Sequence, residues 1–139
     1  MTTVVLLSTA DTDLLAARAS GVGYRIGNPA RIDVERELPA LLEGADIAVV
    51  RLLGGKRAWE DGLAVLRTSG LPTVLLGGEA TPDAELMAES TVPAGVVAQA
   101  LAYLAEGGAA NLAELARFLS DTVLLTGEGF DPPQPMPAY

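Results

Sequence analysis

The sequence predicts a three-layer α/β sandwich around a four-stranded parallel sheet, with strand order 2-1-3-4 and additional helices toward the C-terminus. Short apolar runs end abruptly at polar residues or glycines, which is typical of strands buried on both faces. Segments with helical spacing of apolar residues separate these runs. Only 4% of the 139 residues are aromatic, so we expect an interior of closely packed aliphatic side chains.

The first part of the chain predicts a strand, a helix and a second strand. Residues 2–9, TTVVLLST, have the pattern of a buried strand. Residues 11–21 are expected to form a helix that ends at Gly21, and residues 23–29 a short second strand. We expect Ser8 and Thr9 to serve as caps. The candidate N-cap residues of this helix are Thr9, Asp11 and Thr12.

The middle of the chain repeats the alternation twice. Residues 31–44 predict a short helix with Pro39 in its first turn. Residues 45–55, ADIAVVRLLGG, predict the third strand, and residues 56–70 a helix. Residues 71–79, LPTVLLGGE, predict the fourth strand. The apolar stripe of the helix between them consists of Trp59, Leu63 and Leu66.

Two further helices are expected after a polar connection that holds one helical turn at residues 83–88. The first opens at Pro93 and stops at Gly107-Gly108. Asn111 and Glu114 have capping-box spacing and predict the start of the second. Residues 122–126 allow either a continuation of this helix or a fifth strand. The resulting fold is Rossmann-like or flavodoxin-like.

The C-terminal composition suggests a domain boundary. Residues 1–128 are expected to form the α/β domain. Residues 129–139 contain four prolines, favour extended polyproline geometry and are predicted to be a linker to domains downstream of Tyr139.

Composition excludes several classes of function. The formal net charge of −9 argues against nucleic-acid or anionic-membrane partners, because phosphate binding needs clustered Lys and Arg. The sequence has no Cys or His, which removes thiolate chemistry, the commonest general base and the usual zinc ligands. No apolar run is long enough for a membrane span, and we expect a cytoplasmic protein.

The loop after the third strand resembles a phosphate-binding loop but fails its requirements. A Walker loop needs a glycine five positions before its Gly-Lys pair and a Ser or Thr after it. Val50 and Arg57 stand at these positions around Gly55-Lys56. The first strand ends in Ser-Thr-Ala-Asp, so the glycine-rich dinucleotide turn is absent from the sequence too.

Three loops are expected to meet outside the carboxyl ends of the strands, beside the switch point between strands one and three: residues 8–13, 51–59 and 77–81. They contain no acid-base pair, and we predict no catalytic or metal-binding residue. We predict a ligand or interdomain contact edge formed by Arg51, Gly54, Gly55, Trp59, Gly77, Gly78 and Glu79.

Each of these residues also has a structural explanation. The glycine pairs can serve tight turns, and Trp59 can cover the sheet from the core. Arg51 can pair with a neighbouring carboxylate. The candidate partners of Arg51 are Asp11, Asp13 and Glu79.

Five segments of the sequence carry a family resemblance: VVRLLGGKRAWEDGL, VLLGGE, PDAELMAESTVPAG, ALAYLAEGGAANL and FLSDTVLLTGEGF. They resemble the N-terminal region of the large (CobN-type) subunit of aerobic, ATP-dependent cobaltochelatase and, more distantly, the large subunit of magnesium chelatase. The resemblance implies an enzyme of cobalamin biosynthesis, a ligase that inserts cobalt into hydrogenobyrinic acid a,c-diamide while AAA+ partner subunits hydrolyse ATP. No catalytic residue is carried over to this region.

The resemblance therefore implies a non-catalytic domain that helps to enclose the tetrapyrrole or docks against the remaining domains of the large subunit. We expect no cofactor to be bound by this domain; cobalt, ATP and magnesium are implied for the full complex. The alternative is an acidic interaction module that recruits the ATPase subunits. An independent small-ligand enzyme is the weakest interpretation, because acid-base residues are lacking.

Overall fold

A computed structural model describes residues 2–79, 81–127 and 129–135. Its four strands pair in parallel in the order β2-β1-β3-β4, as predicted. In the register, Leu6 lies opposite Ile26 on one side and Val49 on the other. The strands are β1 (Val4–Ser8), β2 (Arg25–Gly27), β3 (Ile47–Leu52) and β4 (Thr73–Gly77).

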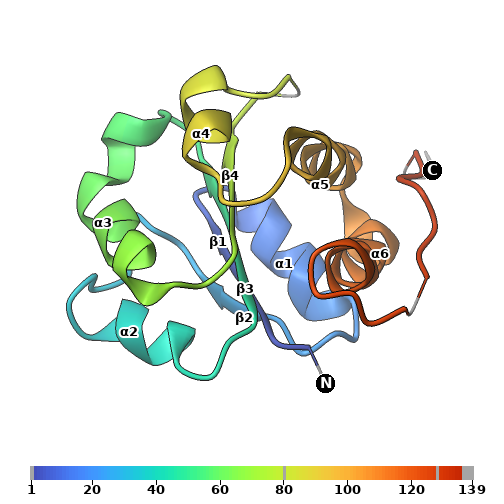
Figure 1. Ribbon diagram of the computed structural model, residues 1–139, viewed down its shortest axis with the longest axis horizontal. Helices are drawn as coiled ribbons and strands as arrows, with labels where there is room; N and C mark the ends of the chain where they lie inside the picture. The colour runs from blue at the N-terminus through green and yellow to red at the C-terminus, as the bar shows by residue number, and fades with distance from the viewer. Residues whose placement is uncertain (1, 80, 128, 136–139) are drawn as a thin grey trace.

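The helices cover both faces of this sheet, which confirms the predicted α/β architecture (Figure 1). One layer contains α2 (Glu37–Leu42) and α3 (Glu60–Ser69), which follows a 3₁₀ turn at Lys56–Trp59. The other contains α1 (Asp11–Ala19), α5 (Ala94–Glu106) and α6 (Gly108–Thr122). The short α4 (Ala84–Glu89) lies against β4. In the part of the chain that the structure describes, no helix is long and apolar enough to cross a membrane.

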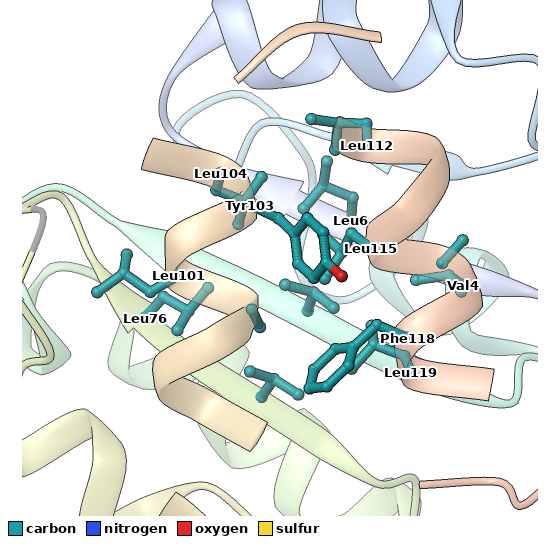
Figure 2. Packing of buried hydrophobic residues seen from close by; sticks show 14 of the residues in the cluster. Val4, Leu6, Leu76, Leu101, Tyr103, Leu104, Leu112, Leu115, Phe118 and Leu119 are labelled. Carbon is teal, nitrogen blue, oxygen red and sulfur yellow. The ribbon is translucent and has the colours of Figure 1, made fainter. Parts of the chain in front are cut away.

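Alternate strand residues point into two separate cores, because successive side chains of a strand face opposite sides of the sheet. Val4 and Leu6 face α1, α5 and α6, where Figure 2 shows them near Leu115 and Phe118 of α6. Val5 belongs to the core on the α2 and α3 side. All five residues of β1 are buried, as expected for a strand covered on both faces.

The outer edge of β4 is bonded to the segment after α4. The Thr73 N–H donates to Thr91 Oγ1 at 2.7 Å, and the Thr91 N–H donates to the Thr73 carbonyl at 2.9 Å. Ser90 Oγ accepts from the Leu75 N–H at 2.8 Å. These side chains satisfy backbone groups that an edge strand would otherwise leave exposed.

The predicted start of the last helix is wrong. α6 begins at Gly108, one residue after the cap of α5, so Asn111 lies inside the helix and caps nothing. The reason is conformational: Gly107 and Gly108 have φ values of 74° and 86°, which let the chain turn directly from one helix into the next. The fifth-strand alternative for residues 122–126 is also wrong, since α6 ends at Thr122 and no strand follows in residues 123–127.

The proline-rich stretch packs back onto the domain along its described part, residues 129–135. It has no regular helix or strand there and runs beside α6 in Figure 1. Side chains of α5 and α6 bond its backbone at Asp131 and Gln134. Residue 128 of the predicted domain and residues 136–139 of the predicted linker lie outside the described residues, and the domain boundary stays a prediction.

Candidate contact edge at the carboxyl ends of the strands

Arg51, the fifth residue of β3, joins the end of β4 to the first turn of α1. Its Nε donates to the Gly77 carbonyl at 3.2 Å and its Nη2 to the Gly78 carbonyl at 3.2 Å. Its Nη1 lies 3.2 Å from Asp13 Oδ2 in α1. The side chain is only 12% exposed, so the guanidinium is directed into the protein. The predicted pairing of Arg51 with a carboxylate is confirmed, and Asp13 is the partner.

Asp13 is held as tightly as Arg51. Its side chain is 7% exposed, and its Oδ2 accepts from Ser8 Oγ at 2.8 Å. Ser8 Oγ in turn accepts from the Ala10 N–H at 3.1 Å. A buried ion pair persists only where further hydrogen bonds satisfy its remaining atoms, and Ser8 supplies one here.

The predicted N-caps of α1, Thr9, Asp11 and Thr12, are wrong, whereas Ser8 does bond a backbone N–H at the start of the helix. The N-cap is Ala10, which has no side-chain cap bond. Thr9 instead bonds β3, because its N–H donates to the Arg51 carbonyl at 3.1 Å and its Oγ1 accepts from the Leu53 N–H at 3.0 Å. These hydrogen bonds join the two loops at the switch point between β1 and β3.

A hollow of about 330 Å³ lies farther along the same edge, between the turns that follow β3 and β4. We call it the glycine groove. It brings together five of the seven residues predicted for the contact edge: Gly54, Gly55, Gly77, Gly78 and Glu79. The other residues that line it are Leu52, Leu53, Thr81, Pro82 and Asp83.

The glycines are required by the shape of these turns. Gly55 has a φ of 74°, which other residues rarely adopt. A Cβ on Gly78 would lie 2.5 Å from Leu53 Cδ1 and 3.2 Å from Leu53 Cα, so only a glycine lets the two turns approach. The turn explanation predicted for the glycine pairs is thereby confirmed at these two positions.

Two predicted residues do not line the groove. Arg51 lies beside it and holds the carbonyls of two of its glycines. Trp59 is 7% exposed and packs in the core on the α3 side, which confirms the core interpretation of this residue. Its ring covers Gly62 so closely that a Cβ there would lie 2.2 Å from Trp59 Cε2.

Leu53 is a groove residue that the sequence prediction missed. Its side chain is 71% exposed at the groove. The signal is present in the sequence, because the second leucine of RLLGG lies beyond the point where a buried strand ends. Thr81, Pro82 and Asp83 are also missing from the prediction, since the polar composition of their connection favours a solvated face.

Beside the switch-point loops, a second carboxylate is paired with an arginine. Asp11, next to the switch-point loops, accepts from Arg31 Nη1 and Nη2 at 3.0 and 2.9 Å and from Asn28 Nδ2 at 3.1 Å. The Arg31 hydrogen bonds, and after them that of Asn28, lower the pKa of Asp11 from its ordinary value of 3.8. Among the described residues, no three Asp or Glu side chains gather in a way that could hold a metal ion.

No protein-family model matches the chain, and no curated protein matches it. Among solved structures, the chain is similar to the catalytic subunit of cobaltochelatase from Mycobacterium tuberculosis, with 54% sequence identity and a TM-score of 0.94 over 98% of this chain. The chain is therefore related to cobaltochelatase catalytic subunits. This confirms the resemblance found in the sequence. The match covers only 12% of the other chain, an extent consistent with the expected N-terminal region.

Proposed function

We propose that this chain forms a non-catalytic N-terminal domain of a cobaltochelatase large subunit. The 54% identity to a cobaltochelatase catalytic subunit over nearly the whole chain supports this role. In the proposal, the full subunit acts in cobalamin biosynthesis in the cytoplasm. It inserts cobalt into hydrogenobyrinic acid a,c-diamide, and AAA+ partner subunits hydrolyse ATP with magnesium.

The glycine groove is the proposed contact edge, and its occupant is another domain of the same large subunit. Arg51 and Asp13 are turned inward and bonded to each other, so this ion pair holds the fold together. What the edge offers outward is a hollow lined in part by four glycines, with the exposed side chain of Leu53 beside them. A small apolar anchor that enters such a hollow is typical of a docking contact.

The test is Leu53→Asp in the full-length large subunit. Leu53 is 71% exposed, so the change should leave the domain folded while it places a charge in the docking contact. We expect cobalt insertion, assayed with the ATPase subunits, to fall by about tenfold. The matched control is Leu15→Asp on α1, where another leucine is 62% exposed away from the groove.

Equal insertion rates for the two variants would contradict the proposal. A second measurement separates the two possible occupants of the groove. If Leu53→Asp weakens binding of the tetrapyrrole but leaves the domain as resistant to limited proteolysis as before, the groove encloses the macrocycle and does not dock a domain. Trp59→Ala is unsuitable as a test, because it would open a cavity in the core.

The net charge of −9 favours one second candidate, the recruitment of the ATPase subunits through an acidic surface. A pull-down of those subunits by the full large subunit should then weaken steeply as salt is raised. Reversal of exposed charges on this domain would weaken it further. If neither higher salt nor charge reversal weakens the binding of the ATPase subunits, this candidate is excluded. That result would not contradict the docking role of the groove.

A further inference from the structure

The last described residues of the chain are bound by side chains of α5 and α6. The Asp131 N–H donates to Glu114 Oε1 at 2.8 Å, and the Asp131 carbonyl accepts from the Tyr103 hydroxyl. The Gln134 N–H donates to Asn111 Oδ1 at 2.9 Å, and the Gln134 carbonyl accepts from Asn111 Nδ2 at 2.7 Å. Both backbone polar groups of two residues are thus satisfied by side chains.

The sequence of this stretch favours polyproline II geometry. Every residue of DPPQP, residues 131–135, is a proline or precedes one, and this pattern disfavours a continuous helix. A polyproline II helix has three residues per turn, so Asp131 and Gln134 face the same side. Asn111 and Glu114 are also three apart, on one face of α6. Glu114 binds Asp131 and Asn111 binds Gln134, so the segment runs antiparallel to α6 over these positions.

An aromatic contact adds an apolar anchor to these hydrogen bonds. The Phe130 ring meets Phe118 edge to face, with ring centroids 5.0 Å apart, and Phe118 lies 5.7 Å from Tyr103. Figure 2 shows Tyr103 and Phe118 reaching between α5 and α6. A preformed polyproline II segment loses little conformational entropy when it docks, so few contacts suffice to hold it.

We propose that the surface formed by Tyr103, Asn111, Glu114 and Phe118 is a binding site for a polyproline II segment, occupied by residues 130–134 of the same chain. The site recognises an aromatic residue followed by two backbone positions three residues apart. Its occupation fixes the direction in which the chain leaves the domain, so the predicted linker is held against the fold over this stretch. The proposal does not depend on the proposed function.

Hydrogen exchange in the 139-residue chain tests it directly. Asp131 and Gln134 carry the only backbone N–H groups of residues 131–135, because the other three are prolines. We expect both amides to exchange at least about tenfold more slowly than in a synthetic peptide of residues 129–139. Exchange at the peptide rate would overturn the proposal. Protection that disappears on dilution would also overturn it, because the site would then be filled by a second copy.

Matched variants assign the protection to individual side chains. Glu114→Ala should abolish it at Asp131, whereas Glu114→Gln keeps an acceptor oxygen and should retain it. Asn111→Ala should abolish it at Gln134. The variant also loses the hydrogen bond from Asn111 Nδ2 to the Gly107 carbonyl, so an amide of the sheet must show that the fold is kept. The control is Arg117→Ala, which removes only the ion pair to Glu114. The Val49 amide of β3 should stay protected in all four variants. If Glu114→Ala and Asn111→Ala leave both tail amides protected, the assigned site is wrong.

Discussion

A single arginine connects the ends of β3 and β4 to helix α1 in this domain. Arg51 bonds the carbonyls of Gly77 and Gly78 at the end of β4 and the carboxylate of Asp13 in α1, and neither partner of the ion pair is appreciably exposed. Removal of one charge from such a pair leaves the other buried and uncompensated, which costs more than the pair itself contributes. The pair therefore matters for stability mainly through the penalty of breaking it.

Arg51→Met should lower the free energy of unfolding by about 3–5 kcal/mol, because Asp13 then stays buried without its cation. Urea unfolding followed by circular dichroism measures this as a shift of the midpoint. The double variant Arg51→Met with Asp13→Asn should recover part of the loss, since no buried charge remains. A loss below about 1 kcal/mol for the single variant, the range of exposed ion pairs, would contradict this account.

Asp11 offers a pH-dependent prediction at the same scale. Its pKa is lowered chiefly by the hydrogen bonds from Arg31, so the carboxylate stabilises the folded state above its unfolded pKa of 3.8. This contribution is lost as the pH falls through the folded pKa. Arg31→Ala should move the pKa of Asp11 up toward 3.8, measured by carboxyl-carbon NMR titration. Arg36→Ala, which removes the partner of Asp33, should leave the pKa of Asp11 unchanged.

At the scale of elements, the junction of α5 and α6 depends on backbone conformation. Gly107 closes α5 and opens α6 with a φ of 74° and a ψ of −174°. This conformation is essentially confined to glycine, because a Cβ would clash with the neighbouring backbone. The junction sets how α6 lies against α1 and α5, and through them how one of the two cores is filled.

Gly107→Ala should destabilise the protein by about 1–3 kcal/mol, the cost of forcing a side chain into this conformation. Gly95→Ala is the matched comparison, since Gly95 lies in α5 with open space where a methyl group would be added and no positive φ. That change should be neutral or stabilise the protein by up to about 1 kcal/mol. Thermal unfolding of both variants measures the difference. Equal melting temperatures would contradict the proposed requirement for glycine at position 107.

The elements that the sequence predicts correctly are those whose signal is local. Continuous apolar runs such as VVLLS identify the strands, and their alternation with helices indicates the sheet order. The spacing of Asn111 and Glu114 predicts a helix cap wrongly, because a capping box and a pair of binding side chains have the same spacing. What they bind comes from residues 131–134, about twenty positions away, and no local pattern encodes that contact.

At the scale of the whole molecule, the sequence predicts the correct edge of the sheet for the candidate site. It predicts only some of the residues that line the glycine groove. The glycine pairs follow from the repeated LLGG endings, since parallel strands bring their carboxyl ends together. The helical spacing of Trp59 with Leu63 and Leu66 indicates that Trp59 points inward, but the sequence does not show that β3 ends at Leu52 and leaves Leu53 exposed. The groove also lies beyond β3 and β4 and not at the switch point. There, hydrogen bonds of Thr9 with Arg51 and Leu53 join the loops that follow β1 and β3.

The hydrogen bonds that Ser90 and Thr91 make along β4 restrict the ways in which this domain can associate. A sheet whose last strand is already occupied cannot recruit a further strand there from a neighbour or from a nascent chain. Copies of the domain therefore do not associate through strand pairing along this edge of β4. Any partner that approaches from this side must engage side chains, which makes recognition depend on sequence and not on backbone alone.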